Sequence, residues 1–335
     1  MRMIQFHHTY EHIISVENLL DAWVEFQLGK RKRADVQEYG QYLMHNVLSL
    51  HTDLASGTYT HAPYEHFRIS DPKPRDIHKA SVRDRLLHHA LYRQLYPFFD
   101  RTFIADSYSC RDGKGTHKAM NRFRAFAYKV SKNHTRTCWV LKCDIKKFFA
   151  SIDHAILKTV LARYIPDSRT LSLLSNISDS FSTEGRAGTG LPLGNLTSQL
   201  LVNIYMNEFD QFAKHTLKAT HYIRYADDFV FLHHDRNLLI NALPYMVVFL
   251  REKLKLTLHP DKLHFKTLAS GIDFLGWVHF PDHKVLRTAT KKRMWRRIKE
   301  VQGKEETIRS YVGMLRQGNA WELRTKVGNE GTAVQ

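Results

Sequence analysis

Two adjacent acidic residues, Asp227 and Asp228, interrupt the segment HYIRYADDFVFL (221–232) and limit how it can fold. The runs on either side are rich in aromatic and β-branched residues, which is typical of short strands. A hairpin turn often contains one aspartate, but two acids without glycine, flanked by Tyr225 and Phe229, are poorly suited to one. Carboxylates that lie close together repel each other and need a cation to neutralise them. We therefore favour a cation site over a plain turn.

A third carboxylate comes from another strand-like segment, CWVLKCDIKKFF (138–149), whose apolar run ends at Asp144. Three acids at two neighbouring strand ends can hold two hard divalent cations through oxygen ligands. Two such ions, roughly 3.5–4 Å apart, stabilise the attacking and leaving oxygens of an in-line phosphoryl displacement. On a strongly basic chain, this chemistry points to nucleotidyl transfer.

The charge balance narrows the class of partner. The chain carries 50 Lys and Arg residues against 33 Asp and Glu, a formal net charge of +17. An excess of this size favours a polyanion, either a nucleic acid or an acidic membrane surface. Between Lys284 and Lys326 basic residues outnumber acidic ones about three to one, which favours contact with a phosphate backbone. No apolar run reaches the roughly 18–20 residues of a membrane span, so the expected partner is a nucleic acid and not a membrane.

The cysteines and the N-terminal residues indicate the cellular compartment in which the protein is expected. Cys110, Cys138 and Cys143 form no CxxC pair and no zinc-binding spacing, and residues 1–12 lack the apolar region of a signal peptide. A sparse, odd set of cysteines predicts reduced thiols in a cytoplasmic protein.

Alternating and helical patterns predict interleaved strands and helices. Asp153 is suited to cap a helix that carries Ile156, Val160 and Tyr164 on one face. The run 64–80 alternates and contains two prolines, which predicts a hairpin with basic residues at its tip. Further helices are predicted at 12–28, 36–55, 81–99 and 290–301, and strands or hairpins at 138–149, 221–232 and 271–280. Without a regular βαβ period, the fold class is α+β or mixed α/β.

The segment GTGLPLGNLTSQLLVNIY (188–205) places three glycines and a proline before an apolar stretch at helical spacing. This pattern predicts a loop that leads into a helix N-terminus. Glycines at such a place let the backbone approach a phosphate or a base closely.

Six segments resemble conserved blocks of reverse transcriptases, in the order found in that family. YADDFVF (225–231) resembles their catalytic hairpin, and LKCDIKKFFASIDH (141–154) the strand with their first metal-binding aspartate. The other blocks are PKPRDIHKASVRDRLLHHAL (72–91), SYSCRDGKGTHKAM (107–120), LREKLKLTLHPDKLHF (250–265) and GIDFLGWVHF (271–280). The resemblance covers about residues 60–325. It implies an α+β right-hand polymerase fold, with an N-terminal extension and fingers at 1–105, a palm at 106–282 and a basic helical thumb and tail at 283–335.

The resemblance also implies roles for single residues. Two Mg²⁺ ions, for which Mn²⁺ can substitute, would be held by Asp144, Asp227, Asp228 and the backbone carbonyl of Ile145. Phe149 matches the aromatic residue that excludes a ribose 2′-hydroxyl, whereas its neighbour Phe148 is expected in the core. The incoming dNTP would meet Lys73, Arg75, Leu193, Gly194 and Gln199. The primer or template would meet Arg111, Lys114, Tyr225, Ala226, Lys262, Lys291, Lys292 and Arg296.

One block separates this chain from most members of the superfamily. Most reverse transcriptases carry Gln-Gly-x-x-x-Ser-Pro where this chain has LGNLTSQ (193–199). The latter form is similar to that of the reverse transcriptases of diversity-generating retroelements. That family implies error-prone copying of a template-repeat RNA at its adenines, from a DNA or RNA primer, in a bacterial or phage-infected cell. It also implies a small, basic, oligomeric accessory variability protein as a partner.

Leu193 gives a physical reason for such errors. Replacing a positioned glutamine by an alkyl side chain removes polar discrimination of the order of 1–3 kcal/mol per good contact. Two other interpretations stay open. The first is a bacterial defence-type reverse transcriptase, which primes itself or polymerises without a template. Such an enzyme would carry the same three aspartates. A polymerase-derived RNA-binding protein without catalysis is disfavoured, because all three aspartates are present.

Overall fold

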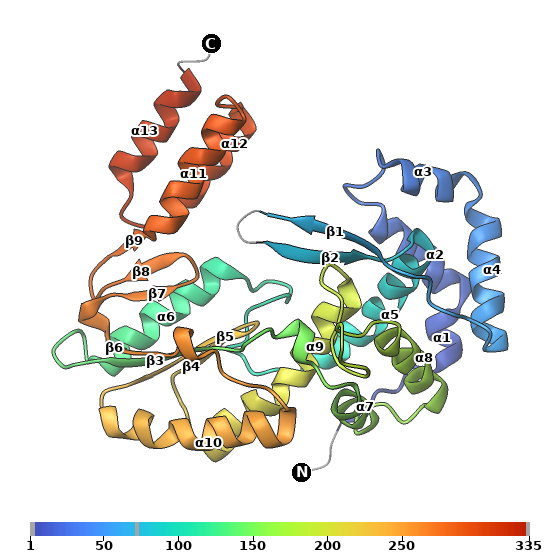
Figure 1. Cartoon of the computed structure of the whole chain (residues 1–335), viewed down its shortest axis with the longest axis horizontal. Helices are drawn as coiled ribbons and strands as arrows, with labels where there is room; N and C mark the ends of the chain where they lie inside the picture. The colour runs from blue at the N-terminus through green and yellow to red at the C-terminus, as the bar shows by residue number, and fades with distance from the viewer. Residues whose placement is uncertain (1–3, 71–73, 333–335) are drawn as a thin grey trace. The chain divides into compact units, whose positions relative to one another are not determined.

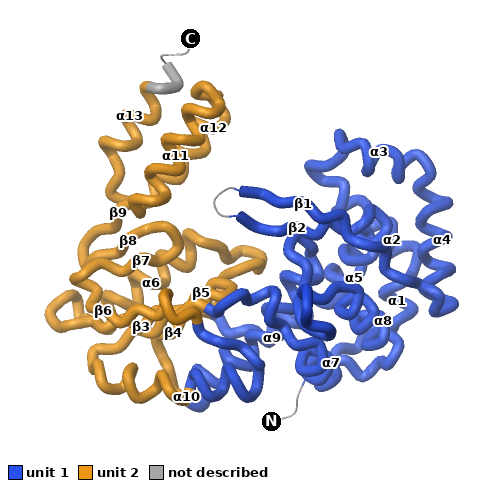
Figure 2. The backbone as a smooth tube through the Cα atoms, viewed as in Figure 1, with its two compact units in different colours: residues 1–105, 145–216, 246–258 blue, residues 106–144, 217–245, 259–335 orange. Residues whose placement is uncertain are grey.

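The computed structural model describes residues 4–70 and 74–332, and Figure 1 labels its helices and strands. The chain divides into two compact units, each built from segments that are separate in sequence (Figure 2). The first comprises 1–105, 145–216 and 246–258, and the second 106–144, 217–245 and 259–335. The predicted mixture of helices and strands is confirmed, whereas the boundaries of fingers, palm and thumb stay predictions. Within the described residues, no helix has the length and apolar character needed to cross a membrane.

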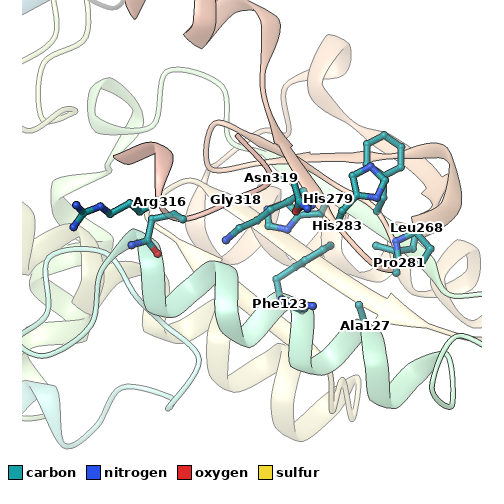
Figure 3. A pocket seen from close by; sticks show the side chains of 13 residues that line it. Phe123, Ala127, Leu268, His279, Pro281, His283, Arg316, Gly318 and Asn319 are labelled. Atoms are coloured by element: carbon teal, nitrogen blue, oxygen red, sulfur yellow. Dashed lines mark hydrogen bonds between the residues drawn. The ribbon is translucent and has the colours of Figure 1, made fainter. Parts of the chain in front are cut away.

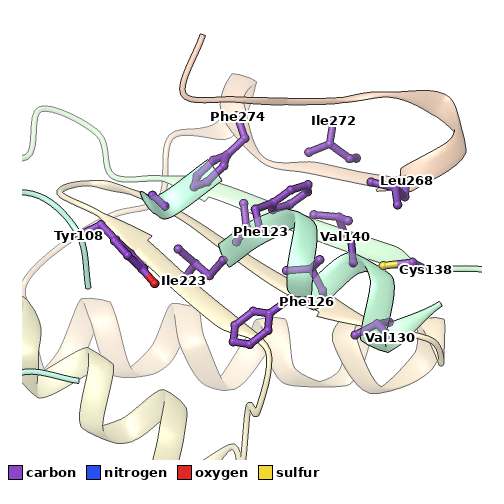
Figure 4. Close-up of a cluster of buried hydrophobic side chains, with 14 residues drawn as sticks. Tyr108, Phe123, Phe126, Val130, Cys138, Val140, Ile223, Leu268, Ile272 and Phe274 are labelled. Atoms are coloured by element: carbon purple, nitrogen blue, oxygen red, sulfur yellow. The ribbon is translucent and has the colours of Figure 1, made fainter. Parts of the chain in front are cut away.

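The second unit is built on a four-stranded antiparallel sheet in the order β4–β5–β3–β6. The strands are β3 (Trp139–Asp144), β4 (Tyr222–Tyr225), β5 (Asp228–His233) and β6 (His264–Thr267). Side chains alternate between the two faces of a strand, so Val140, Ile223 and Val230 gather in one core. There they pack with Phe123 and Phe126 of α6 (Thr116–Val130). Figure 4 shows Val140 and Ile223 in this core beside the two phenylalanines. This core fixes the strand ends that carry the aspartates.

A smaller sheet and three helices complete the second unit. The sheet consists of β7 (Ile272–Phe274), β8 (Trp277–His279) and β9 (Lys284–Leu286). The helices are α11 (Thr288–Glu300), α12 (Glu305–Leu315) and α13 (Trp321–Thr332). Met294 and Ile298 of the basic helix α11 are buried with Trp277 in a second core, as their spacing predicts. Val301, which continues the spacing of Met294 and Ile298, follows the last helical residue and is only half-buried.

The first unit is mostly helical. Its hairpin joins β1 (Glu65–Ile69) to β2 (Arg75–Lys79), which confirms the prediction for 64–80. Its helices are α1 (Tyr10–Ile14), α2 (Val16–Phe26), α3 (Ala34–Gln41), α4 (Leu43–Ser56), α5 (Val82–Asp100), α7 (His154–Ala162), α8 (Ser168–Asp179) and α9 (Leu196–Gln211). Residues of α10 (Arg236–Leu254) belong to both units. Single helical turns lie at Phe149–Ser151, Phe212–Thr216, Pro260–Lys262 and Leu268–Ser270.

Two of the predicted helices are each divided. Ser15 adopts an extended conformation and its hydroxyl accepts a hydrogen bond from the Asn18 N–H, so the segment 12–28 forms α1 and then α2. Tyr42 leaves the helical conformation and separates α3 from α4 within 36–55. In both cases the spacing of apolar residues continues past the break. Such spacing identifies the buried face of a helix, but it does not show where the helix is interrupted.

The helix after Asp153 buries only part of the predicted face, because Val160 is buried as expected but Ile156 and Tyr164 are not. Asp153 caps α7 through the Ile156 N–H, as expected. The helix ends before Tyr164, however, and Leu157 and Leu161 are buried where Ile156 and Tyr164 were expected. Those two side chains are half-buried.

Candidate active site

The acidic pair lies at the tip of the β4–β5 hairpin. Tyr225 pairs with Asp228 in the strand register, so Ala226 and Asp227 alone form the turn. Ala226 has a φ of 56°, a conformation that two-residue hairpin turns usually give to glycine. It costs a residue with a side chain about 1–2 kcal/mol. The expectation that this segment is poorly suited to a turn was therefore wrong, and the strain of the turn falls on the alanine.

Arg224 of β4 holds this turn from the core. Its side chain is completely buried. Its Nη1 donates to the carbonyl oxygen of Ala226 at 3.2 Å, and its Nη2 donates to Oγ of Ser107 at 3.0 Å. Its backbone also pairs with the chain on either side of Ser107, with bonds of 3.0 Å to the Asp106 carbonyl and from the Tyr108 N–H. The glycine- and lysine-rich loop at 107–115 is thereby joined to the acidic hairpin.

The fold brings Asp144 and Asp228 together. They are direct partners in the β3–β5 register, and side chains of such a pair lie on the same face of a sheet. Each acid is neutralised by a lysine. Lys142 Nζ lies 3.2 Å from Asp228 Oδ2, and Lys262 Nζ lies 2.6 Å from Asp144 Oδ1. Lys142 also donates to the carbonyl oxygen of Asp273 in β7 at 2.7 Å.

The surroundings of Asp228 favour a cation. The pKa of its carboxyl is raised to about 7, mainly by burial, with the charges of Asp144 and Asp227 adding to the rise and the charge and hydrogen bond of Lys142 opposing it. Its Oδ1 is buried without a hydrogen-bond partner among the described residues. In the part of the chain that the structure describes, no three His, Cys, Asp or Glu side chains lie close enough to share a metal ion. The arrangement present is thus a carboxylate pair balanced by two lysines.

The residues that follow Asp144 in sequence and were expected at the site belong to the first unit. Ile145 directly follows Asp144 and is buried. Phe148 is buried, as expected for a core residue. Phe149 is half-buried, with its ring 5.6 Å from that of Phe148, and its carbonyl oxygen accepts a hydrogen bond from the Leu191 N–H at 2.8 Å. Of the two phenylalanines, Phe149 is therefore the less buried residue.

The loop that contains Leu193 lies along the β1–β2 hairpin, within the first unit. The His78 N–H donates to the Leu193 carbonyl at 3.2 Å, and Asn195 Nδ2 donates to the His78 carbonyl at 2.9 Å. Gly194 has a φ of 106°, and a Cβ there would lie 3.1 Å from Cγ2 of Ile77. Backbone contact between loop and hairpin thus requires glycine at this position.

The other residues expected to contact the incoming dNTP are close in sequence to the β1–β2 hairpin or to the loop that contains Leu193. Arg75 is the first residue of β2 and is exposed. Gln199 is half-buried in the first turn of α9. Lys73 lies outside the described residues.

The expected primer and template residues are spread over the second unit. Arg111 and Lys114 lie on the loop before α6. Arg111 Nη1 donates to the Ser107 carbonyl at 3.0 Å, and Lys114 Nζ lies 5.2 Å from the centre of the Tyr108 ring. Lys262 pairs with Asp144 in this structure, and its contact with the thumb or primer strand stays a prediction. Tyr225 and Ala226 belong to the acidic hairpin, and Lys291, Lys292 and Arg296 are exposed on α11.

Sequence reasoning missed Lys142, Arg224 and Asn195. A signal existed for Lys142, because it lies two residues before Asp144 and so on the same face of the strand. Arg224 and Asn195 gave no such signal, since Ser107, which Arg224 also holds, and His78, the partner of Asn195, each lie 117 residues away along the chain.

Comparisons with known proteins place the chain among reverse transcriptases and proteins similar to them. Residues 70–279 match the family model described as "Reverse transcriptase (RNA-dependent DNA polymerase)". The chain is 26% identical over 320 residues to protein YkfC of Escherichia coli (strain K12), covering 82% of this chain and 79% of YkfC. It is 25% identical over 166 residues to the group II intron-encoded protein LtrA of Lactococcus lactis subsp. cremoris, covering 48% of this chain and 26% of LtrA.

A solved structure shares the fold. Apo telomerase from Candida tropicalis, truncated from the C-terminal domain, matches with a TM-score of 0.51 and 13% sequence identity. The match covers 73% of this chain and 60% of the telomerase chain. At this identity the likeness concerns the fold alone.

Proposed function

The chain belongs to the reverse transcriptase (RNA-dependent DNA polymerase) family, and on that premise we propose that it copies RNA into DNA by two-metal nucleotidyl transfer at Asp144, Asp227 and Asp228. The observation that carries this proposal is the cross-strand pair of Asp144 and Asp228. Asp227 adjoins this pair in the turn, at the end of the same hairpin.

A hard divalent cation, Mg²⁺ or in its place Mn²⁺, suits these residues. Carboxylate oxygens are the ligands that such ions prefer, and Asp228 Oδ1 is buried without a partner among the described residues. We propose Asp227 and the carbonyl oxygen of Ile145 as further ligands. When bound, the ions would supply Lewis-acid activation of the primer 3′-hydroxyl and stabilise the leaving pyrophosphate. Lys142 and Lys262 balance the carboxylate charge when no divalent ion does so.

The first unit supplies the proposed nucleotide contacts. Arg75 offers a planar fork of donors suited to a triphosphate, with Lys73 as its companion. Gly194 leaves the loop backbone uncovered, because it has no side chain. Gln199 would lie near the base. Phe149 would exclude a ribose 2′-hydroxyl by steric contact with its ring.

Primer extension on a defined RNA template tests the proposal. We expect DNA product in Mg²⁺, and we expect an Asp227→Ala/Asp228→Ala variant to lose extension while it keeps its affinity for RNA. Undiminished extension by this variant would overturn the assignment of the two aspartates. An unmodified chain that binds RNA but extends no primer would instead support the non-catalytic, RNA-binding alternative.

We further propose that the template is the template-repeat RNA of a diversity-generating retroelement, copied with errors at adenines. The support is the block LGNLTSQ (193–199), in which Leu193 replaces a hydrogen-bonding side chain. The loss of one good polar contact is worth about 1–3 kcal/mol of discrimination. An oligomeric basic accessory protein that joins the polymerase on this RNA is the proposed partner.

Sequencing of the DNA product tests this finer assignment. We expect substitutions concentrated opposite template adenines, and fewer of them in a Leu193→Gln variant. An error spectrum that Leu193→Gln leaves unchanged would exclude Leu193 as the cause. Product that forms without a template, or without an added primer, would favour the defence-type alternative.

A further inference from the structure

Three histidines are buried among the described residues, and they differ in what their rings contact. His88 has no hydrogen-bond partner in this part of the chain at either ring nitrogen. His279, which lines a pocket of the second unit (Figure 3), has the carbonyl oxygen of Phe274 at 3.3 Å from its Nε2. Of the three, His154 is the one whose ring nitrogens both face an oxygen atom. Its ring therefore belongs to a hydrogen-bonded joint.

His154 begins α7 and links it to two other segments of the first unit. Its Nδ1 lies 3.0 Å from Oδ1 of Asp179 in α8, and its Nε2 lies 2.6 Å from the carbonyl oxygen of Gly190. Carboxylate and carbonyl oxygens only accept hydrogen bonds, so the ring donates to both when each nitrogen carries a proton. The carboxylate of Asp179 balances the charge of that ring, and its Oδ2 also binds Lys158 Nζ at 2.5 Å. Asp179 therefore orients the imidazole so that Nε2 points at Gly190.

Gly190 belongs to a short segment that pairs with the turn containing Phe149. Its N–H donates to the Ile152 carbonyl at 2.7 Å, and the Leu191 N–H donates to the Phe149 carbonyl at 2.8 Å. Gly190 is buried, and His154 is the donor that its own carbonyl oxygen has among the described residues. A buried carbonyl that loses its donor costs about as much as a lost hydrogen bond. The His154 side chain thus completes the joint that fixes the main chain at Phe149.

This joint leaves little room for displacement. Gly190 has a φ of 108°, and a Cβ there would overlap Oγ1 of Thr183. That hydroxyl donates at 3.0 Å to the carbonyl oxygen of Ala150, the residue directly after Phe149. Leu193 follows Gly190 by three residues. A shift at Gly190 would therefore reach both the turn that contains Phe149 and the loop that contains Leu193.

We propose that His154 is a positioning residue for sugar selection, because it holds Phe149 in place through Gly190. This inference rests on the proposed polymerase function and on the proposed contact of Phe149 with the ribose 2′-position. Rejection of one added hydroxyl group by steric contact depends on where the blocking ring stands. Loss of the bond from His154 therefore admits ribonucleotides more readily, while the aspartates and the triphosphate contacts stay in the chain.

Primer extension with dCTP and with CTP on one RNA template tests this role in the full chain. His154→Leu keeps a similar volume and removes both hydrogen bonds of the ring. We expect the ratio of kcat/KM for dCTP to kcat/KM for CTP to fall roughly tenfold in this variant, the effect of one lost hydrogen bond. His154→Gln keeps a donor near the position of Nε2 and should retain most of the selectivity. His88→Leu is the matched control, because His88 is buried in the same unit without a hydrogen-bond partner among the described residues, and it should leave the ratio unchanged.

Phe149→Ala provides the reference for a lost sugar contact. We expect His154→Leu to change the ratio in the same direction, and the double variant to change it no further than Phe149→Ala alone. Equal losses of kcat/KM for dCTP and CTP in His154→Leu, which leave the ratio unchanged, would overturn the role in sugar selection. An unchanged ratio in Phe149→Ala would overturn it as well.

Amide hydrogen exchange tests the joint itself and does not depend on polymerase activity. We expect the Gly190 and Leu191 amides to exchange roughly tenfold faster in His154→Leu, and to keep their protection in His154→Gln and His88→Leu. Unchanged protection in His154→Leu would overturn the joint. If the unmodified chain extends no primer, the proposed function fails and the role in sugar selection fails with it, whereas the exchange result still decides whether His154 holds Gly190.

Discussion

The guanidinium of Arg224 donates a hydrogen bond to the carbonyl oxygen of Ala226 at 3.2 Å. The donor is completely buried, and the acceptor belongs to a residue with a φ of 56°. Asp227 and Asp228 follow Ala226 directly, so the direction of the chain at Ala226 determines where the two carboxylates begin. Arg224 is therefore a positioning residue for the acidic hairpin.

The first prediction concerns Arg224→Lys. A lysine keeps the positive charge but cannot donate to both Ala226 and Ser107 in the planar geometry of arginine. We expect kcat for primer extension to fall at least about tenfold, which corresponds to one lost buried hydrogen bond of about 1.4 kcal/mol. The KM for dNTP should change little. Steady-state kinetics at saturating Mg²⁺ give both quantities.

Ala226→Gly provides the control for this argument. Glycine adopts a positive φ without strain, so the turn should keep its shape with less help from Arg224. We expect Ala226→Gly alone to stay within about 1 kcal/mol of the unmodified chain in unfolding free energy. In the double variant, glycine should restore part of the kcat lost in Arg224→Lys. A double variant as slow as Arg224→Lys would show that Arg224 acts by a route other than the turn.

The second prediction concerns Lys142, which pairs with Asp228 at 3.2 Å and with the Asp273 carbonyl at 2.7 Å. Lys142→Met removes the charge that balances a buried carboxylate. We expect unfolding free energy in EDTA to fall by on the order of 2 kcal/mol. Because a divalent ion would then be the only strong counter-charge for Asp228, Mg²⁺ should raise the Tm of this variant more than that of the unmodified chain.

Lys158→Met is the matched control for Lys142→Met. Lys158 pairs with Asp179 in a more exposed position, within the first unit. We expect its replacement to leave the Mg²⁺-dependent shift in Tm unchanged. If Lys142→Met also shows no larger Mg²⁺ effect than the unmodified chain, the lysine and the metal do not balance the same carboxylate.

The third prediction concerns Gly194→Ala. The new Cβ would meet Ile77 at 3.1 Å, on a backbone with a φ of 106°. We expect a loss of about 2 kcal/mol in urea unfolding and a several-fold higher KM for dNTP. Gly185→Ala is the control, since Gly185 also has a positive φ but no neighbour within 4 Å. It should lose about 1 kcal/mol and keep its KM. Ile77→Ala combined with Gly194→Ala should recover part of the stability.

Elements that bury one face were predictable from the sequence. The hairpin over 64–80 and the helix at 81–99 follow from alternation and from the spacing of Leu87, Leu91 and Leu95, all of which are buried. The division of α1 from α2 was not predictable in the same way. It depends on the Ser15 hydroxyl, which satisfies a backbone N–H at the cost of helix continuity.

Of the residues in the candidate site, only the aspartates could be predicted from the sequence. Asp144 and Asp228 stood at the ends of strand-like runs, and antiparallel register then makes them neighbours. The partners of those acids depend on contacts between distant segments. Lys262 reaches Asp144 across 118 residues of sequence, and Arg224 reaches Ser107 across 117. No local pattern encodes such pairs, so the lysines and the buried arginine became visible only in the fold.

The fourth prediction concerns stability at acidic pH and rests on His88, in the first unit. Burial and, after it, the charges of His61, His89 and Arg85 together lower the pKa of His88 to about 3. Neither of its ring nitrogens has a hydrogen-bond partner among the described residues. The unfolded chain, with a histidine pKa near 6.5, binds the proton first. Stability is therefore complete above about pH 6.5 and falls as the pH drops toward 3, by about 2 kcal/mol at pH 5.

Replacement of His88 by leucine tests this dependence, because leucine fills a similar volume and cannot be protonated. We expect His88→Leu to unfold in urea at pH 7 with a free energy close to that of the unmodified chain, and to be more stable than that chain at pH 5. His45→Leu, at an exposed position of α4, should leave the slope between pH 7 and 5 unchanged. If His88→Leu has the same slope as the unmodified chain, protonation of another group causes the acid sensitivity, and His89, whose pKa burial lowers to about 4, becomes the next residue to replace.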